Sequence, residues 1–134
     1  VAAGGGFKQT LVDSGIGDVI ANSITESAMN PLIAGWLVAV LIRLATGSAT
    51  VATVTASGIM VPLATGMNPT HLALLVLAIG AGSVFFSHLN DAGFWLVKEY
   101  FGMTVGQTLK TWSLMETILS VVGLGCVMLL SLVL

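Results

Sequence analysis

Charge is the scarcest property of this sequence. Its 134 residues include 4 Lys and Arg and 6 Asp and Glu, so 7% of the chain is charged, against about 25% in soluble globular domains. So few charges cannot cover a water-facing surface. The net charge of −2 excludes electrostatic binding of nucleic-acid phosphates, and the combination of little charge with many apolar residues excludes intrinsic disorder.

Cysteine and catalytic motifs are also scarce. Cys126 is the one cysteine, which excludes an intrachain disulfide and a zinc site built from thiolates. The sequence has no Ser-His-Asp spacing, no HExxH motif and no P-loop, and its Gly4–Gly6 run follows no strand pattern. We therefore predict neither an enzyme nor a bound cofactor or metal.

Apolar residues are abundant, at 56% of the chain with a mean hydropathy of +1.03. A helix needs about 20 mostly apolar residues to cross a hydrocarbon core of about 30 Å. Residues 112–134 and residues 69–87 meet this requirement, the second opening with an Asn-Pro helix start. The fold class is therefore all-α integral membrane. Because the chain opens at Val1 inside a glycine-rich apolar run, we expect it to be the C-terminal part of a longer polytopic protein.

The middle of the chain departs from a simple membrane span. Residues 31–44 and 51–63 are apolar but short, and between them lies the small polar stretch 45–50. This pattern predicts a re-entrant hairpin over residues 31–63. A single kinked helix, with Ser and Thr bonded to the preceding turn, is the alternative. Irregular backbone at membrane depth is tolerated where protein or a wet cavity shields it, so a hairpin tip here indicates a binding cavity.

A second break follows at residues 87–93, where Asn90 and Asp91 are good N-caps for a new helix beginning near Ala92. The alternative is a surface loop in which Asp91 caps the helix in water. Aromatic residues on both sides of the break argue against a wet loop; they are Phe85, Phe86, Phe94 and Trp95. Upstream, residues 7–24 predict a helix–turn–helix because Gly15 and Gly17 interrupt the periodicity, and residues 22–30 read as a polar connector.

Ionisable residues inside a membrane are costly, so each is a functional hypothesis. For Arg43 we favour pairing with a carboxylate or snorkelling to an interface over binding an anionic substrate. Asp91 is the best candidate for proton coupling or for contact with a substrate hydroxyl. His88 is either a proton relay or a simple hydrogen-bond partner. Glu116 is expected in the headgroup region with no special role.

The two breaks share one physical property. A half-helix that begins inside the membrane directs unpaired backbone N–H groups and a positive dipole end toward the cavity, as broken helices of secondary transporters do. Ser48, Thr50 and Asn90 add donors and acceptors suited to a polyhydroxylated ligand. These features favour transport of a small hydroxylated carboxylate.

Several motifs resemble the gluconate permease (gluconate:proton symporter) family. They are AGGGFKQ at residues 3–9, VDSG at 12–15, RLATGSATVA at 43–52, FSHLNDAGFWLVKEYF at 86–101 and TWSLMET at 111–117. The similarity covers essentially the whole chain and matches the C-terminal part of that family. It implies proton-coupled uptake of gluconate or a related sugar acid by a multi-pass protein of the bacterial inner membrane.

The resemblance also implies the fold of the ion-transporter superfamily, with two inverted repeats of which this chain is most of the second. The hairpin is then residues 31–63 with its tip at 46–50, the broken helix is 70–101 with its gap at 87–91, and 112–134 is the last transmembrane helix. Substrate lies between tip and gap, which implies the binding residues Thr46, Gly47, Ser48, Thr50, Ser87, Asn90 and Asp91. Asp91 and His88 are the candidates for proton coupling.

Other readings stay open at this point. Sodium coupling, another hydroxylated carboxylate or a hydroxy amino acid as substrate would give similar motifs. A non-transporting structural subunit, with small residues for close packing, predicts that Ser48, Asn90 and Asp91 bond to other helices and leave no cavity. Expected partners are the substrate, protons, the lipid bilayer and the missing N-terminal repeat, with no nucleic acid; a homo-oligomer is a further alternative.

Overall fold

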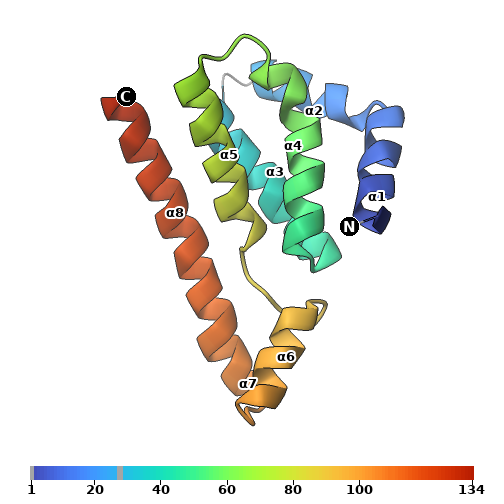
Figure 1. Cartoon of the computed structure of the whole chain (residues 1–134), viewed down its shortest axis with the longest axis vertical. Coiled ribbons are helices and arrows are strands. Elements are labelled where there is room, and N and C mark those ends of the chain that lie inside the picture. Colours follow the sequence, from blue (N-terminus) through green and yellow to red (C-terminus); the bar gives the residue numbers. More distant parts are fainter. Residues whose placement is uncertain (1, 27–28) are drawn as a thin grey trace.

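The computed structural model describes residues 2–26 and 29–134, and that part of the chain is helical with no strand (Figure 1). In chain order the elements are α1 (Ala2–Asp13), α2 (Ile16–Glu26), α3 (Pro31–Thr46), α4 (Ala49–Ala64), α5 (Pro69–Ser83), α6 (Ala92–Tyr100), α7 (Val105–Thr108), the π-helical segment η1 (Leu109–Ser113) and α8 (Leu114–Val133).

Helices α3 and α4 form an antiparallel hairpin with a sharp tip (Figure 1). Gly47 is the C-cap of α3; its φ of 68° is the left-handed conformation that closes many helices, and its N–H donates to the Arg43 carbonyl. The next residue, Ser48, is the N-cap of α4, and its hydroxyl accepts a hydrogen bond from the Val51 N–H. The segment is thus two helices rather than one kinked helix.

Helix α5 starts as the sequence predicts, with Asn68 as N-cap and Pro69 in the first turn. It ends at Ser83, however, so it has 15 residues and is shorter than the predicted span of residues 69–87. Phe86 has a φ of 42°, which an α-helix cannot accommodate. The chain resumes as α6 after Asp91, which caps that helix as expected. The gap therefore runs over residues 84–91 and is wider than predicted.

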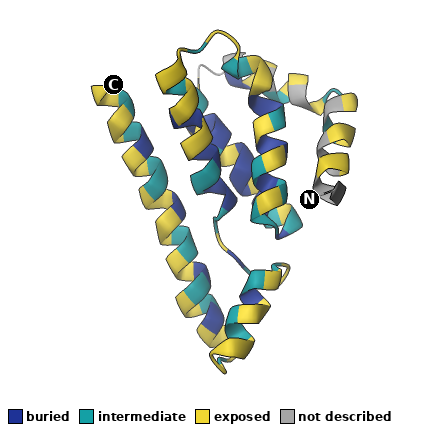
Figure 2. Ribbon diagram, in the orientation of Figure 1, coloured by how far each residue is buried: buried dark blue, intermediate teal, exposed yellow. Residues whose placement is uncertain are grey.

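One continuous helix, Val105–Val133, is long and apolar enough to cross a membrane, among the residues that the structure describes. It comprises α7, η1 and α8, and it begins earlier than the predicted residue 112. The start is set by a capping box in which the side chains of Thr104 and Gln107 bond to each other's backbone N–H groups. Most residues of α8 are exposed (Figure 2), many of them large and apolar, and Ser120 and Val127 are its buried residues.

The core lies around α3, which packs against α4 and α5, while α5 in turn packs against α8. Close approach depends on small residues. A Cβ added to Gly82 on α5 would lie 2.4 Å from the Trp36 carbonyl oxygen on α3. Trp36 also donates from Nε1 to the buried Ser120 hydroxyl at 3.0 Å, which ties α3 to α8. Small-residue contacts of this kind are typical of helices packed within membranes.

The N-terminal pair α1 and α2 packs against α4. The chain turns at Ser14 and at Gly15, which has a φ of 73°, so the predicted helix–turn–helix is confirmed. The polar connector expected at residues 22–30 is shorter than predicted because α2 continues through Glu26. Residues 27–28 of that connector lie outside the described residues.

Candidate functional site

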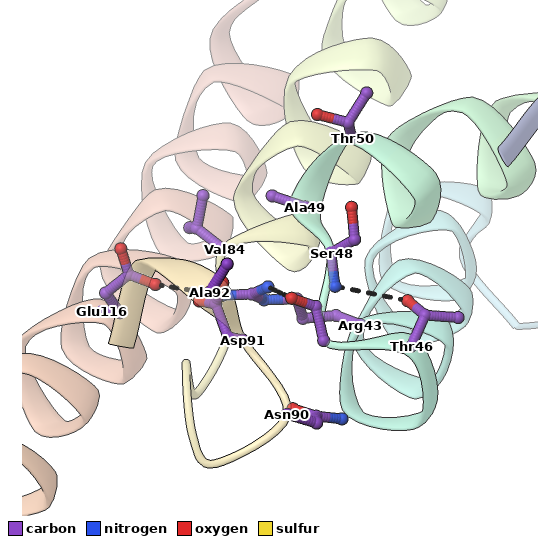
Figure 3. Close-up of a pocket in the computed structure, with 11 residues that line it drawn as sticks. Arg43, Thr46, Ser48, Ala49, Thr50, Val84, Asn90, Asp91, Ala92 and Glu116 are labelled. Carbon is purple, nitrogen blue, oxygen red and sulfur yellow. Dashed lines mark hydrogen bonds and ion pairs between the residues drawn. The ribbon is translucent and has the colours of Figure 1, made fainter. Parts of the chain in front are cut away.

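A cavity of about 450 Å³ lies where the α3–α4 tip meets the gap between α5 and α6, beside the first turn of α8 (Figure 3). It is lined by Arg43, Thr46, Gly47, Ser48, Ala49, Thr50, Val84, Asn90, Asp91, Ala92 and Glu116. Elements far apart in the sequence therefore build one polar site in an otherwise apolar chain.

Arg43 is the centre of this site, and its side chain is 4% exposed. Its Nη2 lies 2.6 Å from Asp91 Oδ2 and 3.6 Å from Glu116 Oε2. Its Nη1 donates to the Gly47 carbonyl at 2.6 Å, whereas its buried Nε has no hydrogen-bond partner. The expected pairing of Arg43 with a carboxylate is confirmed. One cation thus links the hairpin tip, the gap and α8.

Asp91 is held by several donors. Oδ2 accepts hydrogen bonds from Arg43 and from the Ser87 hydroxyl, and Oδ1 accepts one from the Gly93 N–H at 2.9 Å. Its side chain is 15% exposed, so Asp91 caps α6 from a largely buried position rather than in water. Donors to both oxygens favour the charged form of a carboxylate.

The hairpin tip and the gap touch directly. The Asn90 side chain donates from Nδ2 to the Leu44 carbonyl at 2.9 Å. A Cβ on Gly47 would lie 2.2 Å from the Asn90 carbonyl oxygen, a distance that real Cβ atoms do not reach. Glycine is therefore required at the tip for its positive φ and also for the approach of the gap backbone.

The gap is anchored from behind by the π-helical segment η1. Trp112 donates from Nε1 to the Ser87 hydroxyl at 3.0 Å, and the Ser113 hydroxyl donates to the Ser87 carbonyl. Both Ser87 and Ser113 are fully buried. Short π-helical turns occur frequently at functional sites, and this one aims two side chains at the gap.

The structure brings most of the predicted site residues together. Thr46, Gly47, Ser48, Thr50, Asn90 and Asp91 all line the cavity. Ser87 lies behind Asp91, to which it donates a hydrogen bond, and does not line the cavity. His88 does not line it either, because its Nδ1 lies 2.9 Å from the Phe86 carbonyl and its ring stacks near the Phe86 ring. Binding by any of these residues remains a prediction.

Glu116 also lines the cavity, which the sequence did not lead us to expect. Its side chain is 14% exposed and faces Arg43 (Figure 3). The available signal was a carboxylate in the first turn of an otherwise apolar helix, which is costly unless it has a partner or a function.

The site also presents two helix N-termini. α4 begins at Ala49 and α6 begins at Ala92, and both residues line the cavity. First-turn N–H groups have no partner within their own helix, and they lie at the positive end of the helix dipole. With the hydroxyls of Ser48 and Thr50 nearby, the arrangement can hold a carboxylate that also carries hydroxyl groups.

Comparison with known proteins identifies the family of the chain. The model of the GntP family permease matches residues 1–133. The chain is 60% identical over 134 residues to the gluconate permease of Pseudomonas aeruginosa. It is also 53% identical over 132 residues to a high-affinity gluconate transporter of Escherichia coli, and 54% identical over 126 residues to the Gnt-II system L-idonate transporter of that organism.

These matches cover 100%, 96% and 92% of this chain but 30%, 30% and 28% of the respective relatives. The chain therefore spans somewhat less than a third of the length of the curated relatives that it matches. No solved structure matches it. With a family match over nearly every residue and relatives of this identity, the chain belongs to the GntP permease family.

Proposed function

We propose that this chain is the C-terminal part of a permease that takes up gluconate or a related sugar acid across the bacterial inner membrane. Relatives named gluconate permease, gluconate transporter and L-idonate transporter support a sugar acid as substrate. The observation that carries the proposal is the polar cavity between the hairpin tip and the gap, because it joins a buried cation with two helix N-termini.

The cavity suits such a ligand in size and chemistry. Its volume of about 450 Å³ falls within the range of about 300–1,000 Å³ usual for small-molecule sites. In the proposed pose the substrate carboxylate faces the N-terminus of α4 and the Arg43 guanidinium. The substrate hydroxyls then bond to Ser48, Thr50 and Asn90, which offer both donors and acceptors.

The proposed membrane arrangement follows the superfamily model. Residues 31–63 are the re-entrant hairpin, residues 70–101 are the broken helix, and both belong to the second of two inverted repeats. The apolar α3, α4 and α5 are each too short to cross a bilayer as straight rods, which supports half-membrane elements. The first repeat, outside this chain, supplies the other wall of the substrate site, so this chain alone is expected not to transport.

We further propose that uptake is coupled to protons. One guanidinium faces two carboxylates in the cluster, which leaves one negative charge when all three groups are ionised. An anionic substrate is repelled by such a site until a cation neutralises it. A proton can do so at a carboxylate without the oxygen-lined cage of six or so ligands that hard metal cations prefer.

The structural-subunit alternative is less well supported. It requires that Ser48, Asn90 and Asp91 bond to neighbouring helices and leave no cavity. Asp91 and Asn90 do have partners, but all three residues line an open cavity. Close helix packing by small residues does not need such a space.

The test is uptake of labelled gluconate by cells that express the full-length parent, with and without a protonophore. We expect uptake that collapses with the protonophore. Asp91→Asn should reduce uptake strongly, because breaking one partner of a buried ion pair costs about 3–5 kcal/mol. Asp18→Asn, at an exposed aspartate of α2, is the matched control and should transport normally.

Membrane insertion of every variant is checked by immunoblotting of membrane fractions. Uptake of neither gluconate nor idonate by inserted parent protein would contradict the proposed function. Uptake that persists with the protonophore would contradict the proton coupling. Normal uptake by Asp91→Asn would contradict the proposal that substrate binds in this cavity.

A further inference from the structure

We propose that Glu116 is the group that takes up and releases the transported proton, whereas Asp91 stays ionised as the fixed counter-ion of Arg43. This inference rests on the proposed function. It also reverses the sequence-based expectation, which placed proton coupling at Asp91 or His88 and gave Glu116 no role.

The two carboxylates of the cluster differ in their contacts. Asp91 accepts hydrogen bonds at both oxygens, from Arg43, Ser87 and Gly93. A proton on Oδ2 would displace Arg43 or Ser87 and leave it unsatisfied in a buried site, and a proton on either oxygen would remove the negative charge that these donors stabilise. Asp91 is therefore a poor place for a proton that must come and go.

Glu116 is held far more loosely. Among the described residues its single polar contact is the ion pair with Arg43, at 3.6 Å between Oε2 and Nη2. That distance exceeds the range of a hydrogen bond. Because Asp91 lies 2.6 Å from the same Nη2, Arg43 keeps its closer partner when Glu116 becomes neutral. A proton on Glu116 thus breaks no hydrogen bond.

The charged groups around Glu116 are few. Arg43 faces it from α3, and Asp91 faces it from the start of α6. The packed helix α5 carries His71 as its one titratable residue, at the opposite end from the gap. Lys110 of η1 is exposed. The protonation of Glu116 therefore decides whether the cluster carries one negative charge or none.

Protonation of Glu116 couples proton binding to substrate binding. A proton from cavity water binds one Glu116 carboxylate oxygen and forms an O–H group, which makes the cluster neutral and admits the substrate anion. When the site opens to the other side, the proton leaves Glu116 for water as the anion departs. One proton and one univalent anion cross together, so no net charge moves. Like charges within one largely buried site repel strongly, which opposes binding of the anion without the proton.

The experiment separates coupling from binding in vesicles that contain the full-length parent. It measures accumulation of labelled gluconate driven by a pH gradient, and exchange of labelled for unlabelled gluconate at equal pH. Glu116→Gln should lose accumulation but continue exchange, because glutamine mimics the permanently neutral carboxyl. Asp91→Asn should lose both. Glu99→Gln is the matched control, since Glu99 is exposed and pairs with Lys98 away from the cavity.

Each result supports or contradicts the role of Glu116 as the proton-binding group. Accumulation by Glu116→Gln that still follows the pH gradient would overturn the inference, as would loss of exchange together with accumulation. If Glu116→Gln fails to insert, Glu116→Asp decides instead: coupled uptake with an altered dependence on external pH supports the inference, and an unaltered dependence contradicts it. A parent that transports no gluconate at all contradicts the proposed function, which is a separate result.

Discussion

Substitution of Gly47 by alanine tests whether the hairpin tip and the gap touch as the structure has them. Gly47 has a φ of 68°, and an added Cβ would lie 2.2 Å from the Asn90 carbonyl oxygen and 2.7 Å from Asn90 Cγ. The first of these atoms is backbone and cannot rotate away. Gly66 has a φ of 91°, and a Cβ added there would have nothing within 4 Å. An alanine at position 66 would therefore have the backbone strain but no steric overlap.

The expected loss of stability has two contributions, backbone strain and steric overlap of the added Cβ. A left-handed conformation costs an alanine roughly 1–2 kcal/mol relative to glycine, and this term applies to both positions. Overpacking adds about 1–3 kcal/mol, and this term applies only at Gly47. We therefore expect Gly47→Ala to cost about 2–5 kcal/mol and Gly66→Ala about 1–2 kcal/mol.

The assay combines thermal unfolding of the purified full-length parent in detergent with gluconate uptake by cells. Gly47→Ala should lower the unfolding temperature more than Gly66→Ala does. It should also lose most uptake, because the tip must move away from Asn90 and the Asn90–Leu44 hydrogen bond is broken. Equal stability and full uptake in both variants would refute the contact between tip and gap.

Three further substitutions, the first with a matched control, probe the packing and the charge of the chain. Gly82→Ala should destabilise by about 1–3 kcal/mol because its Cβ would lie 2.4 Å from the Trp36 carbonyl, whereas Gly80→Ala meets nothing within 4 Å and should unfold no earlier than the parent. Ser120→Ala removes the acceptor of the Trp36 indole and should cost about 1–3 kcal/mol in thermal unfolding; an unchanged midpoint would mean that the indole finds another partner. Arg43→Gln leaves two buried carboxylates facing each other and should abolish uptake, and normal uptake would show that the cluster is not part of the site.

The two breaks in the helical pattern were predictable from the sequence because they depend on local chemistry. Gly47 and Ser48 are the residue types that end and begin helices, and Asp91 has the short acceptor side chain of an N-cap. The exact end of α5 was not predictable, because residues 84–86 continue the apolar run. What turns them out of the helix is the set of contacts from η1 to Ser87, which come from far along the chain.

The candidate site was predictable in part for the same reason. The residues at the tip and the gap follow from the breaks, whereas Glu116 depends on which side of α8 faces α3. Hydrophobic periodicity gives little help there, since nearly every residue of that helix is apolar. The extra residue in the π-helical segment before α8 shifts which side chains of that helix face α3, and none of the sequence patterns marks such a turn. Arg43 was expected to pair with a carboxylate, but the sequence did not indicate that two carboxylates lie near it.

The π-helical segment η1 has a geometric consequence for the whole C-terminal helix. Each residue of an α-helix advances the chain by about 100° around the axis, and a π turn absorbs one extra residue without rotating the helix on either side. The capping box at Thr104 and the α5-facing side of α8 can thus keep their orientations while Trp112 and Ser113 swing toward the gap. The helix thereby contacts the back of the gap through Trp112 and Ser113 and the cavity through Glu116. Without the extra residue, the side chains that precede η1 would be turned by about 100° relative to those that follow it.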